Sequence, residues 1–233
     1  MTGALAVVTG ADGGIGRATT ELLAADGYRV LALDRRPFTS AAAIATRVAD
    51  LSDYRAIGAL VDELTAEFGV ASVLVNNAGS YLAREFLDYQ PEHFDQVMDV
   101  NLGAAFFLTQ GFARRLIAAG EPGAVVNVGS ISGQSGSPDA AYAASKGALL
   151  TLTRSLGRSL AAHRIRVNAV APGIIETPMA ARIPEDRARA YRAQIPTGRF
   201  GTAAEVAEAI RYLAGPAGSY VTASVLDVNG GLL

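Results

Sequence analysis

The sequence predicts an α/β fold in which one doubly wound parallel sheet is covered by helices on both faces. Short apolar runs rich in β-branched residues alternate with amphipathic stretches along the whole chain, an alternation typical of parallel sheets with crossover helices. The 233 residues are 50% hydrophobic and contain no low-complexity tract or linker, so we expect one domain spanning residues 1–233.

Composition argues against several classes of protein. The 20 basic and 22 acidic residues give a formal charge of −2 without a block of like charge, which disfavours nucleic acid or an anionic membrane as partner and favours a small-molecule substrate. With no cysteine and two distant histidines, the chain predicts neither disulfides nor a metal centre. It shows no basic leader and no apolar run of the roughly 18 residues that span a membrane. We therefore expect a soluble, cytoplasmic protein.

The first strand and helix enclose a glycine-rich turn. Residues 4–9 form an apolar run, Gly10-Ala-Asp-Gly-Gly-Ile-Gly16 follows, and apolar residues then recur at helical spacing. Such a turn lets backbone N–H groups approach a diphosphate at the positive end of the helix. Glycine spacing alone also fits a bare turn, but its place between strand and helix favours the nucleotide site.

The second strand, residues 29–33, ends in Asp34, 18 residues beyond Gly16. A carboxylate there accepts hydrogen bonds from both hydroxyls of an adenosine ribose. It would also repel a 2′-phosphate, with Asp12 adding to the repulsion, so NAD is favoured over NADP. Arg35 and Arg36 leave an alternative open, because they form either a solvated basic turn or a site that admits the phosphate.

The middle of the chain continues the alternation. Residues 41–45 are helix formers in a short crossover, residues 48–51 read as a strand end, residues 54–68 as an amphipathic helix, and residues 73–79 as a buried strand. The last of these runs into Asn76-Asn-Ala-Gly79, which suits packing against the adenosine side of a nucleotide or, alternatively, a strand-ending turn.

A long apolar helix is expected at residues 94–119, with Asn101 in its interior. Asparagine is mildly unfavourable inside a helix, so it indicates a specific hydrogen-bonding role or, alternatively, a satisfied core amide. The strand at residues 124–128 ends at Gly129-Ser130, and the carboxyl ends of strands are where open α/β sheets bind ligands.

The reaction centre is expected in residues 130–146. Tyr142 and Lys146 lie four residues apart, so in a helix at residues 142–162 they share one face. An ammonium nearby would lower the pKa of the tyrosine, and a serine from the preceding loop would hold the oxygen of a carbonyl or alcohol. An exposed helix pair without chemistry is the alternative.

The remaining elements complete the sheet. Residues 166–171 form a strand that Pro172-Gly173 ends, residues 203–214 a helix and residues 224–227 the last strand. Residues 179–194 are polar and predicted helical, and we expect residues 177–200 to form a lid over the substrate.

These motifs, in this order, resemble the short-chain dehydrogenase/reductase family over nearly the whole chain. The set comprises Thr9-Gly10-x-x-x-Gly14-x-Gly16, Asp50, Asn76-Asn-Ala-Gly79, Asn101, Ser130, Tyr142-x-x-x-Lys146 and Pro172-Gly173. The resemblance implies a single Rossmann-like domain with about seven strands, a nicotinamide cofactor, and hydride transfer to or from a substrate carbon. It also implies a homotetramer, or at least a dimer, paired through the helices at residues 94–119 and 142–162.

The resemblance assigns roles to individual residues. Tyr142 would be the general acid/base, Lys146 would bind the nicotinamide ribose, Ser130 would hold the substrate oxygen, and Asn101 would distort its helix so that a water connects Lys146 to solvent. The implied cofactor-binding residues are Gly10, Asp12, Gly14, Ile15, Gly16, Asp34, Asp50, Leu51, Asn77, Ala78, Gly79, Tyr142, Lys146, Pro172, Gly173, Ile175 and Thr177.

One departure from the family concerns the serine. Ser130 and Tyr142 are 12 residues apart, one fewer than is usual in the family, so Ser132 or Ser135 could replace Ser130. The glycines on either side, Gly129 and Gly133, favour Ser130.

Three functions remain in view. An NAD-dependent dehydrogenase acting on a secondary alcohol or ketone of a small substrate ranks first, and the short link from Asp34 to Asp50 is similar to that of enzymes that oxidise cyclic diols. A 3-oxoacyl-(acyl-carrier-protein) reductase ranks second, because that branch generally prefers NADPH and grips its acidic carrier with basic residues where this chain has Glu121 and His163. A non-catalytic NAD-binding scaffold is third.

Overall fold

Seven parallel strands form the central sheet of the protein. The computed structural model describes residues 3–177, 180 and 185–233, with only the backbone of Arg187. The strand order is β3-β2-β1-β4-β5-β6-β9. The strands are β1 (Leu5–Thr9), β2 (Arg29–Asp34), β3 (Ala45–Val48), β4 (Val73–Asn76), β5 (Gly123–Val128), β6 (Ile165–Pro172) and β9 (Val225–Val228).

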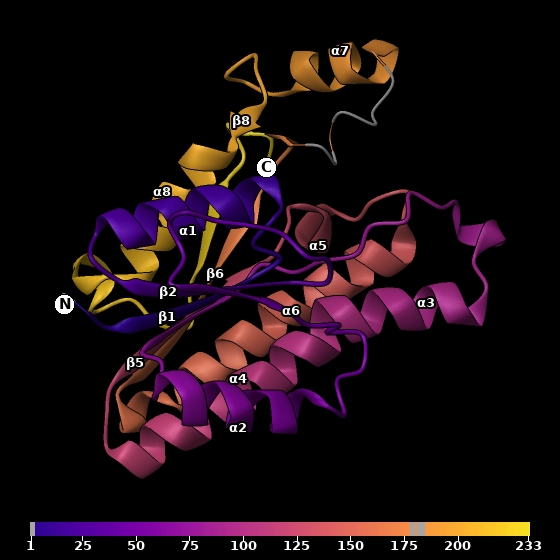
Figure 1. The fold of residues 1–233 in the computed structure, drawn as a ribbon. Coiled ribbons are helices and arrows are strands. Elements are labelled where there is room, and N and C mark those ends of the chain that lie inside the picture. The colour runs from indigo at the N-terminus through magenta and orange to yellow at the C-terminus, as the bar shows by residue number, and fades with distance from the viewer. Residues whose placement is uncertain (1–2, 178–179, 181–184) are drawn as a thin grey trace.

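Helices cover both faces of this sheet (Figure 1). On one side lie α1 (Gly14–Ala25) and α8 (Ala203–Ala214), and on the other lie α2 (Ile57–Phe68), α4 (Ala104–Ala119) and α6 (Ala140–Ser159). The short helix α5 (Ser132–Ser135) and helix α3 (Pro91–Met98) pack on α6. Strands β7 (Ile175–Glu176) and β8 (Gly201–Thr202) form a separate pair. Helix α7 (Glu185–Gln194) lies at the periphery, above β8 in Figure 1. The predicted doubly wound α/β domain is confirmed.

The core consists of two apolar layers, one on each side of the sheet. Alternate side chains of β1 enter different layers: Leu5 and Val7 pack towards α2 and α4, whereas Ala6 and Val8 pack towards α1 and α8. A strand buried on both faces needs an unbroken apolar sequence, which explains why β1 and its neighbours read as continuous hydrophobic runs.

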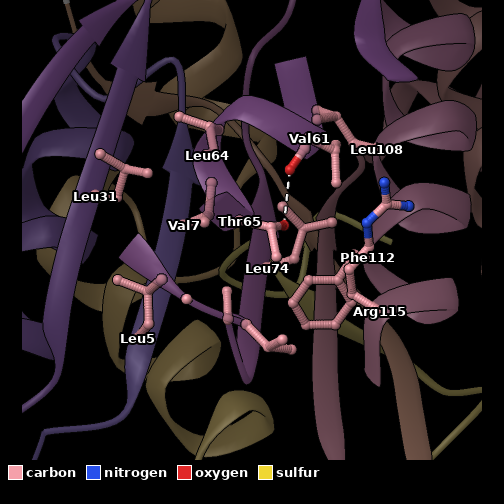
Figure 2. A pocket seen from close by; sticks show the side chains of 13 residues that line it. Leu5, Val7, Leu31, Val61, Leu64, Thr65, Leu74, Leu108, Phe112 and Arg115 are labelled. Carbon is pink, nitrogen blue, oxygen red and sulfur yellow. Dashed lines mark hydrogen bonds between the residues drawn. The ribbon is translucent and has the colours of Figure 1, made fainter. Parts of the chain in front are cut away.

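An apolar cavity of about 40 Å³ lies between the sheet and the helices α2 and α4 (Figure 2). Leu31 and Leu64 line it, Phe112 closes one side, and Arg115, which pairs with Asp62, lies at its edge. None of the predicted site residues lines this cavity. It is a gap in the packing of the core and lies apart from the predicted reaction centre.

The structure corrects several predicted boundaries. Residues 41–45 form no helix, because so short a run cannot offset the cost of helix nucleation, and Ala45 instead begins β3. The helix expected at residues 54–68 begins at Ile57, and the one expected at 142–162 begins at Ala140 and ends at Ser159. The expected helix at residues 94–119 is three elements: α3, a π-helical turn at Asp99–Gly103, and α4. Of the helix expected at 179–194, residues 179 and 181–184 lie outside the described residues.

Candidate active site

The predicted site residues gather at the carboxyl ends of β1, β4 and β5. The strand order reverses between β1 and β4, since β2 and β3 follow on one side and β5, β6 and β9 on the other. Crevices at such a reversal are where doubly wound sheets bind their ligands.

The glycine turn after β1 is braced by the end of β4. Thr9 Oγ1 accepts from the amides of Asn77 and Ala78, both at 3.0 Å, and the Asn77 side chain donates to the carbonyls of Thr9 and Gly10, both at 2.9 Å. A Cβ on Gly16 would lie 2.1 Å from the Gly10 carbonyl oxygen, so only glycine allows the turn to close onto α1. The Asn77 amide thus fixes the turn, and its contact with the adenosine half of a cofactor stays a prediction.

Asp34 at the end of β2 reaches over this turn. Its Oδ2 accepts from the amide of Asp12 at 3.1 Å, and its Oδ1 accepts from the amide of Arg35 at 2.8 Å. Asp12 itself pairs with Arg17 at 2.6 Å, so its charge adds less repulsion against a 2′-phosphate than the sequence suggested. The Arg35 and Arg36 side chains are exposed.

Asp50 and Leu51 lie beyond β3. The amide and hydroxyl of Ser52 donate to the Asp50 carboxylate at 2.9 and 2.7 Å, and these bonds lower the pKa of Asp50. Leu51 is buried in the core layer under α2. The Leu51 side chain therefore belongs to the core that supports the segment carrying Asp50.

Two further segments approach the glycine turn and the lysine. A Cβ on Gly14 would lie 2.8 Å from Thr177 Cγ2, which places Thr177 beside the first turn of α1, close to Ile15. A Cβ on Gly79 would lie 3.5 Å from both Asn101 Oδ1 and Lys146 Nζ. Gly79, just beyond β4, therefore lies beside both Asn101 and Lys146.

The segment after β6 holds the serine loop. The Pro172 carbonyl accepts from the amide of Ile131 at 3.1 Å, and the Gly173 amide donates to the Val228 carbonyl at 3.0 Å. The side chain of Ile175 is buried. These residues therefore order the wall of the site, and their predicted cofactor contacts stay predictions.

Lys146 is almost completely buried, with 3% of its surface exposed. Its Nζ donates to the carbonyl of Val128 at 2.7 Å and lies 5.8 Å from the centre of the Tyr142 ring. Burial disfavours the ammonium and lowers the pKa of Lys146 to about 8.

The Tyr142 hydroxyl is hydrogen-bonded to Ser130. Burial raises the pKa of Tyr142, as do the nearby Tyr81 and Asp139, whereas the hydrogen bond from Ser130 lowers it. The Tyr81 ring packs edge-on against the Tyr142 ring at 5.0 Å. The expectation that Lys146 brings the pKa of Tyr142 below its ordinary value is therefore wrong for this arrangement, because burial dominates.

The serine loop favours Ser130 over its neighbours. Ser130 is buried and its Oγ accepts from the amide of Ser132 at 3.1 Å. The Ser135 hydroxyl lies instead against the carbonyls of Ile131 and Gly136. The hydrogen bond from the amide of Ser132, the first residue of α5, therefore holds the Ser130 hydroxyl in place.

Asn101 lies in the π-helical turn, as the resemblance implied for a distorted helix. Its Oδ1 accepts from the amide of Ser80 at 2.7 Å, and its Nδ2 donates to the Ser80 carbonyl at 3.1 Å and to Ser145 Oγ at 2.9 Å. The Ser145 hydroxyl in turn donates to the Tyr142 carbonyl at 2.7 Å. Asn101 is thus a buried, fully hydrogen-bonded amide in a π-helical turn, a feature frequent at functional sites, and its functional role and the water relay stay predictions.

Sequence reasoning missed the partners that hold these residues. Ser80 and Ser145 carry no signal beyond their polarity, and although Thr9 belongs to the glycine-turn motif, nothing in the sequence indicates its contacts with Asn77 and Ala78. Asp139, which accepts from the Tyr142 amide at 3.0 Å, did carry one, because an aspartate directly before a helix is a strong N-cap.

The residues at this edge fit a nicotinamide dinucleotide. The glycine turn presents backbone amides at the start of α1, the Asp34 carboxylate lies beside that turn, and Ser130, Tyr142 and Lys146 converge at the end of β5. Among the described residues no group of three His, Asp or Glu side chains could hold a metal ion, and no described helix is long and apolar enough to cross a membrane. Fold and site together define the class of nicotinamide-dependent oxidoreductases, and the acid/base role of Tyr142 stays a prediction.

Comparisons with known proteins agree. A family model described as enoyl-(acyl carrier protein) reductase matches residues 10–233. The 3-oxoacyl-[acyl-carrier-protein] reductase of Thermotoga maritima is 37% identical, with 100% of this chain and 99% of that protein covered. The galactitol 2-dehydrogenase (L-tagatose-forming) of Cereibacter sphaeroides is 40% identical, with 99% and 95% covered.

Solved structures are also similar. A 4-hydroxyisoleucine dehydrogenase complexed with NADH superimposes with a TM-score of 0.94 at 28% identity, covering 98% of both chains. A protein from Beutenbergia cavernae described as an NAD(P)-dependent gluconate 5-dehydrogenase, with NADP bound at low occupancy, gives 0.92 at 38% identity, covering 100% of this chain and 97% of that one. The chain belongs to the short-chain dehydrogenase/reductase family, and it is an NAD(P)-dependent alcohol dehydrogenase or ketoreductase.

Proposed function

We propose that the protein is an NAD-dependent dehydrogenase that transfers a hydride between nicotinamide and a secondary alcohol or ketone of a small hydroxylated substrate. The observation that carries this proposal is the contact between Ser130 and Tyr142, with Lys146 buried beside the tyrosine ring. Cyclic compounds are among the candidates, and the similarity to the galactitol 2-dehydrogenase supports a polyol or related substrate.

The side chains divide the work as follows. The nicotinamide supplies or accepts the hydride. The Ser130 hydroxyl donates to the substrate oxygen, Tyr142 Oη exchanges the proton with it, and Lys146 binds the nicotinamide ribose. Asn101 stabilises the π-helical turn between α3 and α4, which leaves room for a water that links Lys146 to solvent.

The pKa of Tyr142, which burial raises, leaves its hydroxyl protonated at neutral pH. A phenol that keeps its proton is ready to donate, so carbonyl reduction runs at neutral pH and slows as pH rises through the pKa of Tyr142. Alcohol oxidation needs the phenolate and changes in the opposite sense. Steady-state rates in both directions over pH 6–11 test this, and a reduction rate that rises with pH would contradict it.

NAD is proposed over NADP because of Asp34. One of the similar solved structures contains NADH and the other contains NADP. The proposed preference of this protein for NAD therefore depends on the Asp34 carboxylate. A carboxylate and a phosphate a few ångströms apart near a protein surface repel by about 3 kcal/mol, of which Arg35 and Arg36 offset a part. We expect NADH to bind at least about tenfold more tightly than NADPH, and Asp34→Ser to narrow the gap. Equal binding of both by the unaltered protein would overturn the choice.

The activity itself is tested by nicotinamide absorbance with a panel of polyols, cyclic alcohols and ketones. Tyr142→Phe should retain NADH binding and lose turnover. Turnover that survives this change would refute the role of Tyr142. Tight NADH binding without reaction on any substrate would instead favour the scaffold.

A 3-oxoacyl-thioester reductase is the second candidate. The 37% identity to the Thermotoga maritima enzyme favours it. The two candidate functions are separated by comparing turnover of an acetoacetyl thioester attached to acyl carrier protein with turnover of the same thioester on a short pantetheine arm. A carrier-protein reductase is faster with the substrate on the carrier protein.

We propose a homotetramer, or at least a dimer, of cytoplasmic location. A groove between α4 and α6 is lined by Phe106, Ile117, Leu156 and Leu160, and 40% of Phe106 and 41% of Ile117 remain exposed. Apolar surface of this kind is typical of association. Light scattering at micromolar concentration tests it, and a monomeric mass would contradict it.

We also propose that residues 177–200 close over the substrate. Ala188 of α7 packs with Ile195 and Phe200 in a small apolar cluster separate from the two main core layers, which supports movement of the segment relative to the sheet. Protection of this segment from hydrogen exchange on addition of substrate is the expected result.

A further inference from the structure

One buried carboxylate beside the reaction centre has no role in the function proposed above. Asp139 precedes α6 and is 1% exposed. Its Oδ1 accepts from the Tyr142 amide at 3.0 Å and from the Tyr89 hydroxyl at 2.5 Å, and its Oδ2 has no hydrogen-bond partner among the described residues. A buried charge with one unsatisfied oxygen is costly, so its presence needs an explanation beyond helix capping, which an exposed serine would also perform.

The partners of Asp139 connect two parts of the site. Tyr89 ends the segment formed by residues 80–90, which runs from β4 past the reaction centre to α3. The start of the same segment, Ser80, is bound by Asn101, which reaches the Tyr142 carbonyl through Ser145. The segment is therefore tied to the amide of Tyr142 at one end and to its carbonyl at the other.

The start of the segment also touches the Tyr142 side chain directly. The Tyr81 ring packs against the Tyr142 ring at an angle of 71°. An error in the placement of the segment would therefore move the phenol itself, and sub-ångström placement is what proton transfer requires.

We propose that Asp139 is a positioning residue for Tyr142, whose carboxylate binds the Tyr142 amide and the Tyr89 hydroxyl together and so fixes the 80–90 segment against the reaction centre. This inference rests on the proposed function, in which Tyr142 moves the proton. Side chains from this segment then shape the substrate pocket in a fixed relation to the phenol.

The charge of Asp139 has a second effect on the same tyrosine. The groups that face Tyr142 are Ser130 from the β5 loop, Tyr81 from the 80–90 segment, Lys146 one helical turn on, and Asp139 itself. The negative charge of Asp139 disfavours the phenolate and contributes to the raised pKa of Tyr142. Removing the charge while keeping the hydrogen bonds should therefore lower that pKa.

Three variants separate the hydrogen bond between Tyr89 and Asp139, called the anchor below, from the charge of Asp139. Asp139→Asn keeps an oxygen that accepts from both partners and loses the charge, Tyr89→Phe keeps the charge and loses the anchor, and Asp139→Ala loses both. Asp88→Asn is the matched control, because it removes an exposed carboxylate from the same segment.

Hydrogen exchange measured by mass spectrometry reports the anchor without any substrate. Peptides covering residues 80–90 should exchange faster in Tyr89→Phe and Asp139→Ala, and at the wild-type rate in Asp139→Asn and the control. Kinetics report the consequence for catalysis: Tyr89→Phe should lower kcat by about 10- to 100-fold, while Asp139→Asn should shift the pH profile of kcat/KM to lower pH. A residue that merely stabilised the fold would not move that profile.

Two results would overturn the proposal: unchanged exchange of residues 80–90 in Tyr89→Phe, or an unshifted pH profile in Asp139→Asn. If Asp139→Ala does not fold, the two conservative variants, Tyr89→Phe and Asp139→Asn, still test the proposal. If the unaltered protein turns over no substrate, the proposed function fails, while the exchange rates still test the anchor on their own.

Discussion

Lys146 should destabilise the folded protein at neutral pH. It is the single lysine of the chain and is almost completely buried. In the fold its pKa is about 8, against 10.5 in the unfolded chain. At about 1.4 kcal/mol per pH unit, this difference corresponds to roughly 3 kcal/mol of lost stability when both states carry the proton.

The sign of the pH dependence follows from proton counting. Between pH 8 and 10.5 the unfolded chain holds the lysine proton and the folded protein releases it. The free energy of unfolding therefore rises with pH across this window, and the penalty is constant below it and absent above it.

Lys146→Met isolates the effect. The variant removes the charge and leaves the Val128 carbonyl without its donor, a loss of about 1 kcal/mol. At pH 7 we therefore expect the variant to be about 2 kcal/mol more stable than the unaltered protein and catalytically inactive. Above pH 10.5 it should be about 1 kcal/mol less stable.

Urea unfolding at intervals from pH 7 to 11 measures the difference, with Arg154→Met on the exposed face of the same helix as control. Nitrogen-15 labelling of lysine gives one side-chain resonance, whose titration reports the pKa directly. Parallel stability curves for the two proteins, or a lysine that titrates near its ordinary value, would refute the reasoning.

Three further predictions concern the core and the serine loop. Val7→Ile should partly fill the 40 Å³ cavity and stabilise the protein by up to about 1 kcal/mol, measured by urea unfolding; a loss of stability would show that the cavity cannot accept a methyl group. Arg166→Met removes a guanidinium that donates to five carbonyls around the end of α8 and should cost about 3 kcal/mol by the same assay; an unchanged midpoint would contradict this. Ser130→Ala should lower kcat about 100-fold and Ser132→Ala only slightly, and the reverse order in steady-state assays would reassign the serine.

The sequence was sufficient for the sheet and for the catalytic pair because both follow from local periodicity. Apolar runs alternating with helices determine a parallel sheet, and a four-residue spacing places Tyr142 and Lys146 on one helix face. Local propensity failed at residues 41–45, because the run is too short to offset the cost of helix nucleation and its last residue, Ala45, pairs with Leu31 of β2.

The supporting contacts were out of reach for a different reason. Asn101 meets Ser80 across 21 residues and Tyr89 meets Asp139 across 50, and neither partner repeats with any period. Segments such as residues 80–90 have no pattern that fixes their path. Only the packing of α3 and α6 determines which side chains they reach.

Three buried polar side chains around the reaction centre are hydrogen-bonded to the backbone, which makes their placement independent of neighbouring side chains. Buried polar groups are tolerated when they are hydrogen-bonded, and here Lys146, Asp139 and Asn101 all bind backbone groups. Backbone partners persist when neighbouring side chains change. Substitutions at exposed residues of the 80–90 segment, such as Phe86 and Leu87 at 70% and 90% exposure, should therefore leave the placement of Tyr142 unchanged.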